Sequence, residues 1–329
     1  MMLPSGRFLK ILYTFLGLVL AVVIYIAFFY LRYMYHGMID ATDSDNAQRL
    51  TSIDIKDLKK LLKPYSIGSH VKILDVYETT PEEERYECVS LKTSIGTTPI
   101  CIYPPALDGI ISREIYSFGI WEPVNLKTLE SILLEDRSLH FIDVGANLGV
   151  YTLTALKHLR KTVSVDANPI NGMHLRRSVK LGGYESLSTI VINAVTDVRD
   201  PVILALPDTR NVGGATVVKT NDTDLSRTIA TDAILMNDLL DVIHFDRAVL
   251  KMDIESSEYA ALRYSEKIFQ RVDIPYIFME FRNRDLILKR KLELMGYTAY
   301  RIDDRTKPQS SKIEEWEEDV LWVKNKKTL

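Results

Sequence analysis

The hydrophobic positions along residues 126–329 alternate between short continuous apolar runs and stretches in which apolar residues recur at helical spacing. Continuous runs of about four to eight apolar residues are typical of strands buried on both faces, whereas spacings of three and four are typical of helices. We therefore predict strands at residues 139–144, 161–165, 189–194, 202–206, 247–254, 275–281, 297–302 and 320–323, and helices from 150, at 171–181, at 258–269 and at 285–295. This alternation predicts an α/β fold with a doubly wound, mostly parallel, Rossmann-like sheet that a hairpin closes.

An apolar stretch near the start of the chain is of a different kind. Residues 11–31 contain no charge, and a helix of that length spans the hydrocarbon core of a bilayer, about 30 Å. A cleavable signal peptide is the alternative, but its apolar region would be shorter and a small-x-small cleavage site would follow it. We predict that residues 11–31 form a transmembrane helix, preceded by a short tail at residues 1–10, and that the lipid bilayer is therefore a partner.

The charges that flank this stretch bear on its orientation. Arg7 and Lys10 precede it, whereas Arg32 follows it directly and acids at positions 40, 43 and 45 come soon after. A basic excess on the N-terminal side favours a cytoplasmic N-terminus and places the remainder in the lumen of the Golgi or the endoplasmic reticulum. The N-glycosylation triplet that begins at Asn221 agrees with a luminal location. An inverted anchor is the alternative.

Composition and pattern divide the rest of the chain into three parts. Residues 32–65 are predicted to form a stem, residues 66–125 a small β-containing extension, and residues 126–329 the α/β domain. Strand-like runs at 71–77, 86–92 and 99–103 would place Cys88 and Cys101 on neighbouring strands, where a disulfide and two buried thiols both fit. Trp121 and Glu122 form either a cap beside the site or a packing contact.

Composition also excludes some classes of protein. A net charge of −3 argues against a nucleic-acid-binding protein, which needs a basic face, so we predict no nucleic-acid partner. Two cysteines are too few for a disulfide scaffold or a cysteine zinc site, and no other spacing demands a metal, so we predict none. Asp43-Ser44-Asp45 has the D-x-D form that some glycosyltransferases use to hold a metal, but beside a membrane anchor we interpret it as solvated charge. His140 is interpreted as a core histidine.

The principal candidate site follows the strand at 139–144. Asp143 is followed by Gly145, Asn147 and Gly149, after which the chain becomes helical. Glycines let the backbone approach a ligand and a helix N-terminus offers free N–H groups, so a strand, glycine turn and helix are typical of nucleotide binding. A glycine turn that serves only packing is the alternative.

A second acid favours the nucleotide interpretation. Asp166 ends the next strand, and an acid about 20 residues past the glycines can bind both hydroxyls of a ribose. The end of the third strand, at Asn193 and Ala194, should face the adenine. We therefore predict that an adenosine-type cofactor binds to Asp143, Gly145, Asn147, Gly149, Asp166, Asn193 and Ala194.

The spacing of the glycines narrows the choice of cofactor. Dinucleotide sites usually need G-x-G-x-x-G to hold a pyrophosphate, whereas this chain has GANLG at 145–149. The carboxylate of Asp143 would repel a pyrophosphate and would suit a cationic group, such as the amino group of S-adenosylmethionine. A nicotinamide-dependent enzyme therefore fits the pattern poorly.

At this point the sequence resembles the FkbM-type methyltransferases, whose pattern is D-V-G-A-N-x-G, an E-P-N-P-like turn and K-x-D-x-E-G-x-E. The corresponding segments here are DVGANLG at 143–149, DANP at 166–169 and KMDIESSE at 251–258. Asp166-Ala167 stands where Glu-Pro is usual, which keeps the carboxylate, and Ser256 stands where glycine is usual, which affects the active-site loop. The resemblance implies a fold of the class I methyltransferase type, S-adenosylmethionine as cofactor, and O-methylation of a hydroxyl-bearing acceptor. The predicted luminal location, and not the resemblance, suggests a glycan as that acceptor, and a hydroxyl-bearing small molecule is the alternative.

Four acids, Asp253, Glu255, Glu258 and Glu280, follow or end the strands at 247–254 and 275–281. Methyl transfer to a hydroxyl needs alignment and removal of a proton. We predict Asp253 as general base or substrate contact, Lys251 as its partner, and Glu255 as a second base or a residue that orients the loop. Glu258 is predicted to cap the following helix. The alternatives are a charge network at a helix start and, for the whole chain, a catalytically inactive membrane-tethered binding protein on the same fold.

Overall fold

The computed structural model describes residues 65–67, 70–205, 215–218, 228–281 and 285–325. The chain divides into two compact units, residues 1–53 and 54–329, and all described residues belong to the second. The predicted tail, membrane anchor and nearly all of the stem lie outside these ranges, as does the triplet at Asn221. Among the described helices, none has both the length and the apolar character that a membrane crossing requires.

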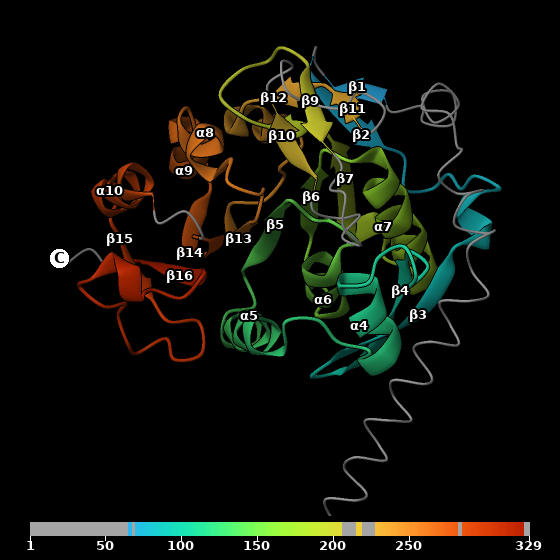
Figure 1. Ribbon diagram of the computed structural model, residues 1–329, viewed down its shortest axis with the longest axis horizontal. Coiled ribbons are helices and arrows are strands. Elements are labelled where there is room, and N and C mark those ends of the chain that lie inside the picture. The colour runs from blue at the N-terminus through green and yellow to red at the C-terminus, as the bar shows by residue number, and fades with distance from the viewer. Residues whose placement is uncertain (1–64, 68–69, 206–214, 219–227, 282–284, 326–329) are drawn as a thin grey trace, which may run out of the picture. The chain divides into compact units, whose positions relative to one another are not determined.

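A nine-stranded sheet forms the centre of this unit (Figure 1). Its order is β1-β2-β7-β6-β5-β13-β14-β16-β15. The parallel strands are β5 (His140–Val144), β6 (Thr162–Asp166), β7 (Ser188–Ile192), β13 (Arg247–Met252) and β14 (Asp273–Glu280). From β5 the chain first runs outward to β7 and later returns beside β5 as β13, so the topological switch point lies between β5 and β13. The predicted doubly wound, mostly parallel sheet is confirmed.

Side chains of the central strands alternate between two apolar cores. In β5, Phe141 joins one core, whereas Ile142 and Val144 join the other. Helices α4 (Ile111–Phe118), α5 (Pro123–Glu135), α6 (Val150–Lys157) and α7 (Pro169–Gly182) cover the first core. Helices α8 (Glu258–Leu262), α9 (Glu266–Arg271) and α10 (Leu286–Leu294) cover the second (Figure 1). Because both faces are covered, the central strands read as continuous apolar runs in the sequence.

The prediction of a single helix at 258–269 is wrong about its continuity, because the chain forms two short helices there. The hydroxyl of Ser265 donates to the carbonyl of Leu262 over 2.8 Å at the end of α8. That hydrogen bond uses a carbonyl that a continuing helix would have paired with a backbone N–H. The first helix therefore ends at Leu262, and a second helix begins at Glu266.

The strand predicted at 202–206 lies outside the central sheet. β9 (Val202–Ala205) pairs with β10 (Thr216–Val218) and β11 (Thr228–Thr231) in a separate antiparallel sheet. β8 (Ala194–Val195) and β12 (Ala233–Ile234) form a short parallel pair after β7. The sequence also predicts a loop at residues 207–226, rich in Gly, Asn, Asp and Thr, but most of it lies outside the described residues.

The segment predicted as an extension belongs in part to the central sheet. β1 (Tyr65–Ile67) and β2 (Val71–Leu74) add two antiparallel strands beside β7. β3 (Glu87–Thr93) and β4 (Gly96–Ile102) form a hairpin in which Cys88 and Cys101 stand opposite each other and form a disulfide. Of the two alternatives left open by the sequence, the structure has the bonded form.

Two antiparallel strands complete the far edge of the sheet. β16 (Asp319–Lys324) is inserted between β14 and β15 (Tyr297–Tyr300) and is antiparallel to both. The sequence predicts an exposed loop at 303–319, and these residues are exposed or half-buried except for Trp316, which is buried against Phe281 and Trp322, with ring centroids 5.5 and 5.8 Å away. Burial of these large aromatic surfaces folds the loop back onto the sheet.

Candidate active site

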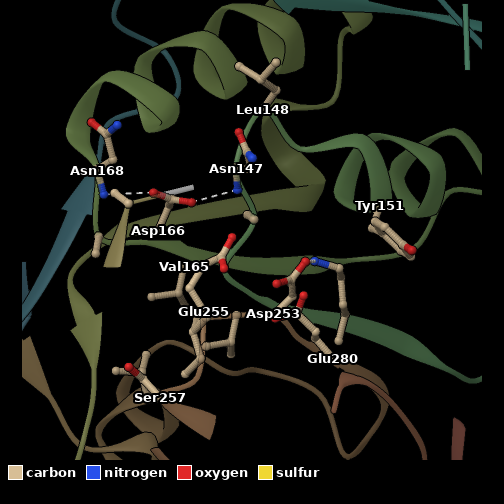
Figure 2. A pocket seen from close by; sticks show the side chains of 18 of the residues that line it. Asn147, Leu148, Tyr151, Val165, Asp166, Asn168, Asp253, Glu255, Ser257 and Glu280 are labelled. Carbon is tan, nitrogen blue, oxygen red and sulfur yellow. Dashed lines mark hydrogen bonds and ion pairs between the residues drawn. The ribbon is translucent and has the colours of Figure 1, made fainter. Parts of the chain in front are cut away.

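A cavity of about 320 Å³ opens at the carboxyl ends of β5, β6 and β13, beside the switch point. Figure 2 shows its two ends, one with Asn147, Asp166 and Asn168 and the other with Tyr151, Asp253 and Glu280. The predicted site residues that line it are Gly145, Asn147, Asp166, Asn193, Ala194, Lys251, Asp253 and Glu255. Asp143 and Gly149 do not line the cavity. They flank residues 145–148 of the glycine turn, which do line it.

The glycine turn at 145–149 requires unusual backbone angles. Gly145 and Gly149 have φ of +84° and +86°, and Asn147 has φ of +51°. A Cβ on Gly145 would lie 1.8 Å from the carbonyl oxygen of Asp253, and a Cβ on Gly149 would lie 2.3 Å from Leu175. Both glycines are therefore needed for conformation and for close approach, and Gly145 brings the β5 turn against the end of β13.

Asp166 is held by donors from two elements. The backbone N–H of Asn147 donates to Oδ2 over 2.7 Å, and the backbone N–H of Asn168 donates to Oδ1 over 2.8 Å. The amide of Asn171 donates to Oδ1 over 3.2 Å. Burial raises the pKa of this carboxyl to about 6, although these hydrogen bonds favour its ionised form. The acid is thus fixed at the pocket wall, as its predicted role with a ribose requires.

The sequence DANP also starts the next helix. The side chain of Asn168 accepts from the N–H of Ile170 over 3.0 Å, and Pro169 occupies the first helical position of α7. Both features are typical of a helix N-terminus. Within the described residues, Asn147 Oδ1 and Asn168 Nδ2 are buried and have no hydrogen-bond partner.

Asp143 lies behind the lining, which corrects its predicted contact with a cationic ligand group. Its side chain is fully buried, and Thr152 Oγ1 donates to Oδ2 over 2.6 Å. Burial raises the pKa of the Asp143 carboxyl, and the positive charge of Lys251 on the neighbouring strand opposes that rise. The carboxylate therefore acts on the pocket through Lys251.

Lys251 and Asp253 stand together at the end of β13. Lys251 Nζ donates to Asp253 Oδ2 over 3.1 Å and lies 4.8 Å from the ring centre of Tyr151. Burial alone would lower the pKa of the Lys251 ammonium, but the charges of Asp253, Asp143 and Glu122 raise it above its usual value. Lys251 is thus a buried cation that orients Asp253, as the sequence predicts for this pair.

The loop after β13 shows the consequence of serine at position 256, where the family pattern has glycine. Glu255 and Ser256 have φ of +50° and +75°, and Glu255 reaches the cavity. Glu258 Oε1 accepts from the N–H of Ile254 over 3.0 Å, so this side chain closes the loop at the start of α8. Glu258 stands in the first turn of α8, but its side chain accepts from the loop before the helix, and α8 has no side-chain cap hydrogen bond, so the predicted capping role is replaced by one in closing the loop. The loop backbone adopts a conformation that suits the glycine of the family pattern.

Replacement of Ser256 by glycine is accordingly expected to raise the free energy of unfolding by about 0.5–1 kcal/mol, because left-handed backbone costs a residue with a side chain about 1–2 kcal/mol. Urea denaturation measures the change. Ser257→Gly is the matched control, since Ser257 has φ of −100° and gains nothing from glycine. A Ser256→Gly protein that is less stable than wild type would contradict the expectation.

Asn193 has a different role from the predicted one. Its side chain accepts from the N–H of Lys72 over 2.8 Å and donates to the carbonyls of His70 and Asp232 over 3.2 and 3.1 Å. These bonds tie the end of β7 to β2 and to the segment before β12, so its amide is committed to backbone groups. Contact of Ala194 with an adenine stays a prediction.

Part of the cavity wall was not predicted from the sequence. Ile110 and Ile111 at the start of α4 and Tyr151 in α6 line the cavity, together with Trp121 and Glu122. The hydroxyl of Tyr151 donates to Glu122 Oε2. The position of Tyr151, two residues after the last glycine of the turn, was the available signal. The Trp121-Glu122 pair is a wall of the site, in agreement with the first of its two interpretations.

Residues 143–298, a little less than half of the chain, match the family model described as the methyltransferase FkbM domain. The matched segment contains the glycine turn, Asp166 and the loop at 251–258, which are the three motifs that carry the resemblance. The match supports an S-adenosylmethionine-dependent methyltransferase, with S-adenosylmethionine as the cofactor. No curated protein matches the sequence.

Several solved methyltransferase structures are similar in part. The 16S rRNA N2 G1207 methyltransferase RsmC of Thermus thermophilus, in complex with AdoMet and guanosine, is 13% identical, with 73% of this chain and 51% of that chain covered and a TM-score of 0.39. The match thus spans about half of the RsmC chain. A TehB-like SAM-dependent methyltransferase of Corynebacterium glutamicum is 14% identical, with coverages of 65% and 94% and a TM-score of 0.37. An O-methyltransferase of Bacillus cereus with SAH is 10% identical, with coverages of 68% and 92% and a TM-score of 0.38. These likenesses are weak, so the fold assignment rests on the strand order itself.

Proposed function

We propose that the chain transfers a methyl group from S-adenosylmethionine to a hydroxyl of an acceptor. The observation that carries the proposal is Asp166, an acid fixed by three hydrogen bonds at the wall of a cavity beside the switch point. This position is where a fold of this kind binds the ribose of an adenosine cofactor.

The other end of the cavity fits the chemistry of the acceptor. S-adenosylmethionine, when bound, supplies an electrophilic methyl group on a sulfonium centre. Asp253, whose side chain is 36% exposed, accepts the proton that the acceptor hydroxyl loses as its oxygen bonds to the methyl carbon. Lys251 holds one oxygen of that carboxylate in place. Trp121 and Glu122 offer an aromatic face and a carboxylate, a pairing that suits a hydroxyl-rich acceptor such as a glycan.

The cellular setting is also a proposal. Residues 11–31 anchor the chain in a bilayer, with the N-terminus in the cytoplasm and the catalytic part in the lumen of the Golgi or the endoplasmic reticulum. The disulfide between Cys88 and Cys101 supports this orientation, because disulfides persist in oxidising compartments. The same location supports a glycan as acceptor.

A calorimetric titration of the full chain in detergent with S-adenosylmethionine tests the cofactor. Micromolar binding is expected, and Asp166→Ala should weaken it at least tenfold, because a charged acceptor of ribose hydroxyls contributes about 1.5–3 kcal/mol. Asp246→Ala, which removes an exposed acid just before β13, is the control and should bind like wild type. Failure of the folded wild-type chain to bind would overturn the proposal.

Transfer of labelled methyl groups from S-adenosylmethionine into glycan, lipid and protein pools tests the activity. Label in the glycan pool is expected. Asp253→Asn should lower the rate of labelling by a factor of about 10²–10⁴, because the variant lacks the general base. Cofactor binding without label in any pool would favour the second candidate, a membrane-tethered binding protein. Ser256 and the altered Asp166-Ala167 turn are the observations that favour it.

A further inference from the structure

The disulfide-bonded hairpin of β3 and β4 lies against the helix that follows Asp166. The N–H of Cys101 donates to Ser178 Oγ in α7 over 2.8 Å, and Thr98 Oγ1 donates to the hydroxyl of Tyr184 over 3.1 Å. Figure 1 shows the hairpin beside α7. The chain leaves β4 at Tyr103, which is buried between the hairpin and that helix. The hairpin is therefore anchored to the helix that begins three residues after Asp166.

Tyr103 makes a directed contact with that helix. Its hydroxyl donates to Asn171 Oδ1 over 2.7 Å, and its ring lies 4.3 Å from the ring of His174. The backbone N–H of Tyr103 donates to Ser112 Oγ over 3.2 Å, so the residue is fixed at both ends. Asn171 is 1% exposed, and no water can replace a lost partner without a rearrangement.

The phenol decides which way the amide of Asn171 faces. An amide has an acceptor end and a donor end, and a donor at Oδ1 turns Nδ2 the other way. Here Nδ2 lies 3.2 Å from Asp166 Oδ1 and donates to it. The path from Tyr103 through Asn171 to Asp166 is a continuous chain of two hydrogen bonds from the hairpin to the pocket wall.

We propose that Tyr103 and Asn171 are positioning residues that hold the carboxylate of Asp166 in its cofactor-binding orientation, so that the disulfide-bonded hairpin forms part of the S-adenosylmethionine site. The inference rests on the proposed function, because it assigns Asp166 to the ribose of that cofactor. Neither Tyr103 nor Asn171 lines the cavity. Both act through Asp166 alone.

The relay leaves a signature in the pH dependence of binding. Hydrogen bonds from Asn147, Asn168 and Asn171 lower the pKa of Asp166, which burial raises to about 6. Loss of the Asn171 donor should raise that pKa further, so the variant carboxyl is more protonated at pH 6–7 and equally ionised well above it. The charged and titratable groups that act on Asp166 include Asp143 from β5 and Tyr103. Burial lowers the pKa of His174 to about 4, so it does not titrate in this range.

Calorimetric titration of the full chain with S-adenosylmethionine between pH 5.5 and 8.5 tests the proposal. Tyr103→Phe should weaken binding about three- to tenfold at pH 6.5, with the loss shrinking toward pH 8.5 as Asp166 ionises. Tyr86→Phe is the matched control, because Tyr86 also stacks on His174, at 4.0 Å, while its hydroxyl donates to the sulfur of Met173, at 4.0 Å, and not to Asn171. It should bind within twofold of wild type at every pH.

A second variant separates a relay from a general loss of packing. Asn171→Ala should show the same pH-dependent loss, and Tyr103→Phe should add nothing further in that background, because the two residues act as one chain. A loss equal at all pH values, additive effects in the double variant, or unchanged binding by Tyr103→Phe would each overturn the inference. Absence of binding by wild type at every pH would instead overturn the proposed function.

Discussion

Replacement of Lys251 by methionine is expected to lower the free energy of unfolding by about 3–5 kcal/mol, because it leaves the buried carboxylate of Asp143 without a neighbouring cation and removes the ion pair with Asp253. Asp143 is fully buried on the neighbouring strand, directly opposite Lys251, and Asp253 lies 3.1 Å from its ammonium. Methionine keeps the length and packing of the aliphatic stem and removes only the charge. Urea denaturation of the full chain, followed by tryptophan fluorescence, measures the loss.

The matched control is a change at Asp143 that removes the buried negative charge. Asp143→Asn keeps an acceptor for Thr152, and it should recover about half of the stability lost by Lys251→Met when the two are combined. Strict additivity of the two single effects would show that Lys251 and Asp143 are not coupled. Such a result would contradict the reading of Lys251 as the counter-charge of the strand ends.

The second large effect is expected at Gly145. Gly145→Ala should reduce stability by more than about 3 kcal/mol, because the new Cβ meets the carbonyl oxygen of Asp253 at 1.8 Å and the backbone has φ of +84°. It should also abolish binding of S-adenosylmethionine, since either β5 or β13 must move at its pocket end. Thermal denaturation and calorimetric titration give the two readouts.

Gly183→Ala isolates the contribution of the clash. Gly183 has φ of +70° at the end of α7, but a Cβ there would meet nothing within 4 Å. This variant should lose only about 1–2 kcal/mol, the cost of left-handed backbone, and it should bind the cofactor normally. Equal losses at the two glycines would mean that the contact between the glycine turn and Asp253 does not constrain the site.

The central fold could be predicted because local patterns determine it. Each parallel strand is covered on both faces and therefore appears as an apolar run, and each helix between strands carries its own turn or capping signal, such as DANP before α7. The pairing of β2 with β7 could not be predicted in this way. It joins segments more than a hundred residues apart, and neither segment contains a sequence pattern that indicates which strand it pairs with.

The site was predictable for its backbone and less so for its side chains. Gly145 and Asp166 are recognisable because their backbone conformation and strand-end position require those residue types. Asp143 and Asn193 resemble ligand-binding residues in the sequence. In the structure, Asp143 accepts a hydrogen bond from Thr152, and the amide of Asn193 is hydrogen-bonded to three distant backbone groups. Such partners are contributed by tertiary contacts, which a spacing pattern does not contain.

The position of β16 has a consequence for how the chain acquires its structure. Because β16 fills the gap between β14 and β15, both of these strands keep an open hydrogen-bonding edge until residues 319–324 have emerged from the ribosome. Trp322, fully buried in this strand, completes the aromatic cluster at the same moment. A nascent or truncated chain that lacks this strand would expose two adjacent apolar strand edges, which are templates for aggregation and for recognition by chaperones. Closure of the sheet is thus a late, nonlocal event, and quality control of the enzyme depends on its last strand.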